Sequence, residues 1–350
     1  MFRAVQTILC ENPYNKLWDS FLFFENEPIS KTFLQGIYQK KQPEKCKTLA
    51  FQNTAKFIYN IKQSRQYYAA AMQSEILIRP LLLYYGMVSL LKAFILTQDP
   101  FYPATTRVLQ HGLTSRKIKK NQYSVGEDEI KIQKEGLLPY VYSFLTNKPL
   151  ENRYKVHELF ALIPELQTSY QKVYQKGNLI PVNLSAYYDF QHPSTLFYLP
   201  ESVLDYTHRS YHSFIDYLNR YNTGESYFAP SPLETPGGII RIKWNHPLQQ
   251  KVTENGNGFE NQLFVADYKG NFHFLISPTA VLPEITTHFM IMYILGMLCR
   301  YETERWGEII FSFSSEDMYI IHEFLSISSR KFPNMIYDVL MKERNIFQMS

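Results

Sequence analysis

The spacing of apolar residues along the chain predicts a mainly helical protein. From Thr48 to Ile78, apolar residues recur at intervals of three and four, which is typical of one face of a long helix. This helix should end just before Arg79 and Pro80, because the residue that precedes a proline avoids the helical conformation. A second helix is then predicted for the run RPLLLYYGMVSLLKAFIL, in which Pro80 suits the first helical turn.

The remainder of the chain alternates between shorter helical and irregular patterns. Short helices and loops are predicted for the first fifty residues, and helical spacing is found at 153–175 and 200–222. The prolines of the intervening NLIPVNLSAYYDFQHPSTLFYLP favour a loop or an edge segment. Helices return after Pro283 and are expected to continue close to Ile346.

Strand-like patterns are concentrated in the C-terminal half. IIRIKW alternates as a strand does, and two alternating apolar runs within 262–277 flank the turn YKGN, which predicts a hairpin. A small extended element followed by a short helix is expected within 121–150. The predicted fold class is therefore mainly α (α+β), a multi-helix bundle with a small antiparallel β-hairpin. We expect a helical domain at 1–222 that includes an N-terminal wrap, a β-rich insertion at 223–285, and C-terminal helices at 286–350 that pack back on the core.

The apolar run at 79–96 is long enough to cross a bilayer, but the pattern favours a core helix. Arg79 and Lys92 lie within it, and a cation at the centre of a membrane span costs about 2.5–3.5 kcal/mol. Gly86, Ser89 and Ala93 fall at helical spacing and form a stripe of small residues. We expect this stripe to face a neighbouring helix at close range.

Composition places the chain among globular proteins. Of 350 residues, 45% are apolar and 19% are charged, which is enough to build a large core. The three cysteines are far apart in sequence and include no CxxC pair, so neither a disulfide framework nor a cysteine zinc site is expected. The N-terminus lacks the apolar core of a secretory signal. We therefore expect a cytoplasmic protein without a cofactor.

The motifs of the common enzyme classes are absent from the sequence. It contains no Walker loop, GxGxxG, HExxH or GxSxG motif. Arg107 and His111 are four residues apart, and on one helix face they could hold a phosphodiester and supply an acid or base. A histidine that caps the end of a helix before Gly112 is the alternative. A basic cluster follows, at Arg116, Lys117, Lys119 and Lys120.

Two predicted core helices each carry a cation near one end. Tyr85 and Lys92 are separated by the same interval as Tyr293 and Arg300. These cations, together with Arg79, could extend from the helix ends into water or pair with acids. Alternatively, Arg79, Lys92 and Arg300 line a shared anion-binding cleft.

Several motifs resemble those of the YaaC-like family of bacterial proteins. They are RPLLLYYGMVSLLKAFIL followed by HGL, then HFMIMYILGMLCRYETERWGEI and SSRKFPN, and the resemblance extends from about residue 45 to the C-terminus. The paired tyrosines, small residues, terminal lysine and His-Gly also resemble the helical core of HEPN domains, many of which are RNases or partners of nucleotidyltransferases in defence systems. Catalytic HEPN domains usually carry four to six residues between Arg and His, whereas Arg107 and His111 enclose three.

Three functions follow from these expectations. The first is a binding or regulatory protein of HEPN-like type that recognises RNA, a nucleotide or a protein partner. The second is a metal-independent ribonuclease of a defence or stress system, in which Arg107 holds the phosphate and His111 is the acid or base. The third is a scaffold for protein interactions, with a homodimer formed through the apolar helices. No membrane partner is expected.

Overall fold

The computed structural model divides into two compact units. The helical unit comprises Cys10–Phe160, Leu282–Met341 and Met349–Ser350, and the sheet unit comprises Met1–Leu9, Ala161–Val281 and Lys342–Gln348. The change of unit thus falls at Ala161, whereas the sequence analysis placed the start of the β-rich part at 223. The structure describes residues 4–116, 123–188, 193–222, 227–231, 237–245, 259, 261–276, 282–311 and 316–350.

The helical unit is built around two long helices from the first hundred residues and two from the last seventy. Its α-helices are α1 (Pro13–Leu22), α2 (Glu27–Lys41), α3 (Cys46–Gln73), α4 (Arg79–Gln98), α5 (Leu137–Leu145), α6 (Val156–Phe160), α10 (Glu284–Tyr301), α11 (Thr303–Phe311) and α12 (Asp317–Met341). Short 3-10 helices are η1 (Phe23–Glu25), η2 (Pro43–Lys45), η3 (Thr106–Leu109) and η4 (Val125–Glu127). An antiparallel sheet completes the unit, with β2 (Leu113–Arg116), β3 (Glu129–Ile132) and β4 (Arg153–Lys155) in that order.

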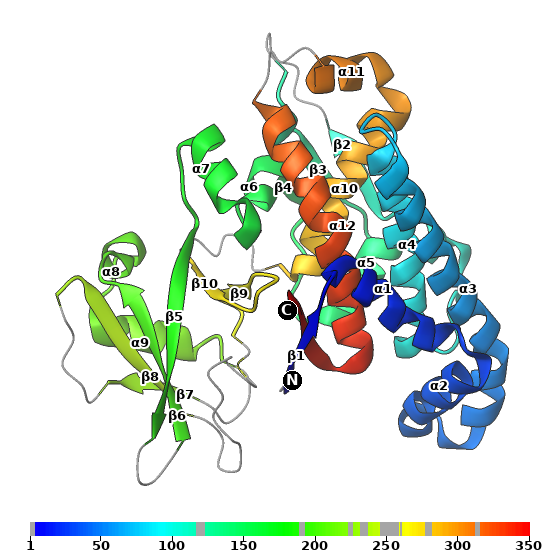
Figure 1. Ribbon diagram of the computed structural model, residues 1–350, viewed down its shortest axis with the longest axis horizontal. Helices are drawn as coiled ribbons and strands as arrows, with labels where there is room; N and C mark the ends of the chain where they lie inside the picture. The colour runs from blue at the N-terminus through cyan, green and yellow to red at the C-terminus, as the bar shows by residue number, and fades with distance from the viewer. Residues whose placement is uncertain are drawn as a thin grey trace. The chain divides into compact units, whose positions relative to one another are not determined.

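The predicted pair of long helices is present. α3 ends at Gln73, five residues before the predicted end, and α4 begins at Arg79 with Pro80 in its first turn. α4 packs against α3, α10 and α12 (Figure 1). By length and composition α4 could cross a membrane, but 72% of its most apolar window is buried inside the structure. An apolar helix covered on several sides by other helices is the expected form of a core helix.

The predicted stripe of small residues on α4 faces α3. A Cβ atom at Gly86 would lie 2.6 Å from two ring atoms of Tyr68, so only glycine allows this approach. The hydroxyl of Ser64 donates to the carbonyl oxygen of Gly86 at 2.9 Å, and the hydroxyl of Ser89 lies 3.4 Å from the amide oxygen of Gln63. The two helices are therefore in close contact along the first half of α4.

The sheet unit is more extensive than the hairpin predicted from the sequence. Its main sheet has the strand order β7-β8-β6-β5-β10-β9, and every adjacent pair is antiparallel. The strands are β5 (Leu179–Tyr188), β6 (Pro193–Pro200), β7 (Tyr227–Pro230), β8 (Ile239–Asn245), β9 (Phe264–Ala266) and β10 (Phe272–Leu275). The helices of the unit are η5 (Pro164–Leu166), α7 (Gln167–Tyr174), α8 (Ser202–Thr207) and α9 (Tyr211–Asn219). The predicted hairpin is confirmed as β9 and β10.

The expectation of a loop or edge at NLIPVNLSAYYDFQHPSTLFYLP is wrong, because this stretch supplies the two central strands. β5 pairs with β10 through Leu179–Val182 and with β6 only from Asn183 onwards. Pro181 thus lies where β5 has a strand on one side alone, so its missing N–H leaves no hydrogen bond unmade on the other side. The prolines of β6 stand at its two ends. Proline therefore marks the limits of pairing here and does not prevent it.

Both ends of the chain were also predicted incorrectly. Residues Ala4–Cys10 form β1 and Glu343–Met349 form β11, and these strands pair with each other. The apolar spacing predicted helices and loops at the N-terminus and helix up to about Ile346, but α12 ends at Met341. A strand whose partner lies at the other end of the chain gives no local pairing signal. The predicted helical stretch at 153–175 is likewise divided among β4, α6, η5 and α7.

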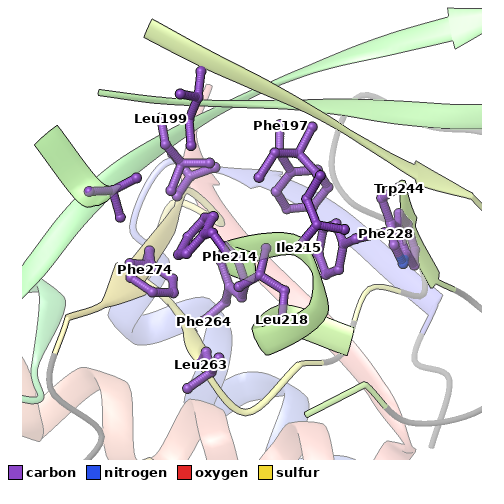
Figure 2. Packing of buried hydrophobic residues seen from close by; sticks show 14 of the residues in the cluster. Phe197, Leu199, Phe214, Ile215, Leu218, Phe228, Trp244, Leu263, Phe264 and Phe274 are labelled. Atoms are coloured by element: carbon purple, nitrogen blue, oxygen red, sulfur yellow. The ribbon is translucent and has the colours of Figure 1, made fainter. Parts of the chain in front are cut away.

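An aromatic cluster fills the space between the main sheet and α9 (Figure 2). Phe197 from β6 contacts Phe228 from β7 and Trp244 from β8, with ring centroids 5.3 and 6.2 Å apart. Phe214 from α9 meets Phe274 from β10 in an edge-to-face contact at 5.2 Å. All residues of this cluster belong to the sheet unit, which therefore has a core of its own. Aromatic pairs of this geometry stabilise that core beyond the area that they bury.

Candidate functional site

Several aromatic and cationic groups lie together in the helical unit. They come from the first half of α4, from α10 and from the segment before β2. The hydroxyl of Tyr84 lies 2.6 Å from Nδ1 of His111. The Tyr84 ring stacks on Phe289, with centroids 5.3 Å apart, and meets Tyr293 edge-on at 5.9 Å. The hydroxyl of Tyr293 donates to the carbonyl oxygen of Leu113 at 3.0 Å, which ties α10 to the start of β2.

Two glycines fix the position of His111. Gly112 has φ +76° and Gly136 has φ +134°, and a Cβ at Gly136 would lie 2.3 Å from Cα of Gly112. This close backbone contact lets the first turn of α5 reach the His111 segment: the N–H of Leu138 donates to the carbonyl oxygen of His111 at 3.2 Å. Since both positive φ values suit glycine alone, the His-Gly dipeptide is a structural requirement for placing the imidazole.

Arg300 is held by aromatic groups. Its Nη1 donates to the hydroxyl of Tyr85 at 2.6 Å, and its guanidinium lies over the ring of Tyr301, 4.3 Å from the centroid. Its Nε is buried and has no hydrogen-bond partner in the part of the chain that the structure describes. Within the same part, neither Arg300 nor Lys92 forms an ion pair with a carboxylate. The positive charge at this site is therefore not neutralised by acids among the described residues.

The pKa of His111 is lowered from its ordinary value, first by burial and then by the nearby charges of Arg300 and Lys92. Burial also raises the pKa of Tyr84 far above its ordinary value, so this hydroxyl keeps its proton. The Tyr84 hydroxyl can therefore donate to Nδ1 of a neutral His111, which leaves the imidazole proton on Nε2. In that tautomer, His111 adds an N–H donor to the two cations.

The structure brings together only some of the candidate residues. The charges of Arg300 and Lys92 both contribute to the lowered pKa of His111. Arg79 instead donates from Nη2 to the carbonyl oxygen of Ser74 at 2.8 Å.

The other candidate cations have other partners or cannot be described. Arg107 is exposed and pairs with Glu135 at 3.3 Å. Arg116 pairs with Glu129 at 3.7 Å across β2 and β3. Lys117, Lys119 and Lys120 lie outside the described residues.

The expectation that Arg107 and His111 share a helix face is wrong. The helix at this place is the four-residue η3, which ends at Leu109, and the chain then turns into β2. Because His111 lies beyond the helix, the four-residue interval carries no helical geometry. His111 is a loop residue whose orientation is set by Tyr84 and Gly112.

Sequence reasoning did not assign the tyrosines to the site. Tyr84 and Tyr85 are adjacent on α4, and they contact His111 and Arg300 respectively. The available signal was the pair of tyrosines itself, together with the equal intervals that separate Tyr85 from Lys92 and Tyr293 from Arg300. Helical periodicity gives a tyrosine no role beyond packing, so the hydrogen bonds could not be foreseen.

A second polar cluster links α10 to α12 in the core. Nζ of Lys331 lies 2.5 Å from Oε1 of Glu284, and Nδ1 of His288 lies 2.9 Å from the hydroxyl of Ser328. His288 and Ser328 have no exposed surface, so a substrate cannot reach them. We therefore assign this cluster a structural role. Among the described residues, no group of three or more His, Cys, Asp and Glu side chains could hold a metal ion.

The sequence matches the family model of the YaaC-like protein over residues 22–340. The chain therefore belongs to the YaaC-like family, as its motifs suggested. No curated protein and no solved structure matches it.

Proposed function

We propose that this chain is a cytoplasmic binding or regulatory protein of HEPN-like type, and that its helical unit binds the phosphate of RNA or a nucleotide at Lys92, His111 and Arg300. The observation that carries this proposal is that the charges of Arg300 and Lys92 both lower the pKa of His111, while neither cation has an acidic partner among the described residues. Such a group of donors attracts anions and repels other cations.

Contacts within the protein hold Arg300 and His111 in position before any ligand binds. Arg300 is fixed by Tyr85 and Tyr301, so less conformational entropy is lost when its guanidinium binds a phosphate oxygen. His111 is fixed by Tyr84 and by the backbone beside Gly112. A preorganised arginine that lacks a carboxylate is suited to an exogenous anion. Arg65, by contrast, pairs with the carboxylate of Glu25 at 2.7 Å.

A metal-independent ribonuclease is the second candidate function. It is favoured by the imidazole of His111, which lies close to Arg300, so that Arg300 would take the phosphate-holding role that the sequence suggested for Arg107. In this function, the 2′-hydroxyl of the RNA would attack phosphorus and lose its proton to water, and the bond to the 5′ oxygen would break. The protonated form of His111 would give its Nε2 proton to that leaving oxygen. The exposed Arg107–Glu135 pair has no part in it.

The proposal is tested by binding of a fluorescent single-stranded RNA to the full chain. Lys92→Ala should weaken binding about 5-fold or more and should make the affinity less dependent on salt, because one phosphate contact is lost. Arg107→Ala is the matched control, since it removes an exposed cation that has an acidic partner. Equal affinity of wild type and Lys92→Ala at low salt would refute the proposed site.

The two functions are separated by incubation of labelled RNA with the wild-type chain at pH 6–8. The ribonuclease predicts cleavage that is lost in His111→Ala and retained in Arg107→Ala. If the RNA stays intact while binding persists, the binding function alone remains.

A further inference from the structure

We infer that the ligand is a nucleoside phosphate whose base stacks on Tyr301 while its phosphate is held by Arg300, Lys92 and His111. This inference rests on the proposed function and specifies its ligand. A free nucleotide and a single-stranded RNA both provide an aromatic base joined to a phosphate.

Tyr301 is the last residue of α10 and 61% of its surface is exposed. The guanidinium of Arg300 covers one face of its ring at 4.3 Å from the centroid. Among the described residues, no other aromatic ring or cation is in contact with this ring, so the opposite face is available to a planar group. A planar base placed on that face would lie parallel to the phenol, with the guanidinium on the other side. Tyrosine rings serve in this way as stacking surfaces for bases.

Tyr301 is also close to the phosphate-binding groups. The pKa of Tyr293 is raised mainly by burial; the charge of Arg300 lowers it and Tyr301 raises it further. Tyr293 in turn contacts the imidazole of His111, with ring centroids 5.9 Å apart. Through Arg300, the exposed ring is therefore in direct contact with one of the anion-binding donors.

The combination of groups favours a base-bearing ligand over an inorganic anion. Single exposed aromatic residues are common and by themselves indicate nothing, as Tyr59 illustrates with 68% exposure on α3. Tyr301 differs because its ring touches an arginine that has no acidic partner among the described residues. An inorganic phosphate would use Arg300 and leave this ring in water, whereas a nucleoside phosphate would bury both.

The experiment compares four probes on the full chain by isothermal titration calorimetry. They are pyrophosphate, which lacks a base; adenosine, which lacks a phosphate; adenosine diphosphate; and a short oligoadenylate. We expect adenosine diphosphate to bind about 5-fold or more tightly than pyrophosphate, because stacking adds to the phosphate contacts. A further gain for the oligoadenylate would identify RNA as the source of the nucleotide, and equal affinity would identify the free nucleotide.

Three substitutions test the role of the ring. Tyr301→Ala should weaken adenosine diphosphate about 5-fold or more beyond any loss for pyrophosphate, because the stacking surface is lost in addition to the contact that holds Arg300. Tyr301→Phe keeps the ring and should retain the affinity for adenosine diphosphate. Tyr59→Ala removes an equally exposed ring from α3 and should change neither affinity.

The outcomes distinguish this inference from the function on which it rests. If pyrophosphate binds as tightly as adenosine diphosphate and depends on Lys92, the anion site stands and stacking on Tyr301 is refuted. If Tyr301→Ala weakens both probes equally, the ring only positions Arg300, and the inference also fails. If no probe binds, or if Lys92→Ala changes nothing, the proposed function itself is overturned.

Discussion

The contact between α3 and α4 predicts opposite effects for the same substitution at two helical glycines. In Gly86→Ala, the new Cβ would lie 2.6 Å from two ring atoms of Tyr68, against 3.4–4 Å for ordinary van der Waals contact. The ring of Tyr68 has no exposed surface and packs on Trp18 at 5.0 Å, so it cannot swing aside. Gly36 on α2 is exposed and a Cβ there meets nothing within 4 Å.

The magnitudes decide the sign at each position. Overpacking a core costs about 1–3 kcal/mol, and lengthening the buried bond from Ser64 to the carbonyl oxygen of Gly86 adds about 0.5–1.5 kcal/mol. Alanine regains about 1 kcal/mol through its better helix propensity. Gly86→Ala should therefore lower the free energy of unfolding by roughly 1–3 kcal/mol, whereas Gly36→Ala should raise it by about 0.5–1 kcal/mol.

Urea unfolding of the full chain, followed by far-UV circular dichroism, measures both effects. The relevant transition is the one that carries most of the helical signal, since the two units need not unfold together. Stabilisation by Gly86→Ala of the same size as that by Gly36→Ala would refute the close approach of α3 and α4.

Three further predictions concern the site and the core. Gly112→Ala should abolish RNA binding in the anisotropy assay, because a side chain at φ +76° and the clash with the α5 segment displace His111. The affinity for an anion should rise as pH falls below the ordinary pKa of histidine. The lowered pKa of His111 keeps its imidazole neutral at pH 7, and a bound anion favours the protonated form. Calorimetry across pH 5–8 measures this change in affinity. Burial opposes the charge of Glu284, but Lys331 and His288 outweigh it and lower its pKa. The stability that the Glu284 carboxylate contributes should be fully present above the ordinary pKa of a carboxyl group and should be lost as pH falls below that pKa. Lys331→Met should lower the free energy of unfolding at pH 7 by about 3–5 kcal/mol, as measured by urea unfolding.

The site shows which parts could be predicted from the sequence. Lys92 and Arg300 were candidates because each lies near the end of a predicted apolar helix, and His111 because Arg107 precedes it by four residues and a basic cluster follows. Their grouping depends on the packing of α4 against α10, helices that are separated by almost two hundred residues. Arg107 was paired with His111 on the assumption of a helix, and that assumption failed because η3 ends at Leu109.

The sequence by itself determined the local elements of the helical unit and the membership in the YaaC-like family. Periodic apolar spacing is a local property, and it was sufficient to locate α3, α4, α10 and the β9–β10 hairpin. Only the tertiary structure decided that β5 and β6 are central strands and that the two chain ends pair as β1 and β11. It also decided that Tyr84 contacts His111 and that Tyr85 and Tyr301 contact Arg300. Strand pairing and side-chain contacts join residues far apart in the chain, so no short window of sequence contains the physical information that fixes them.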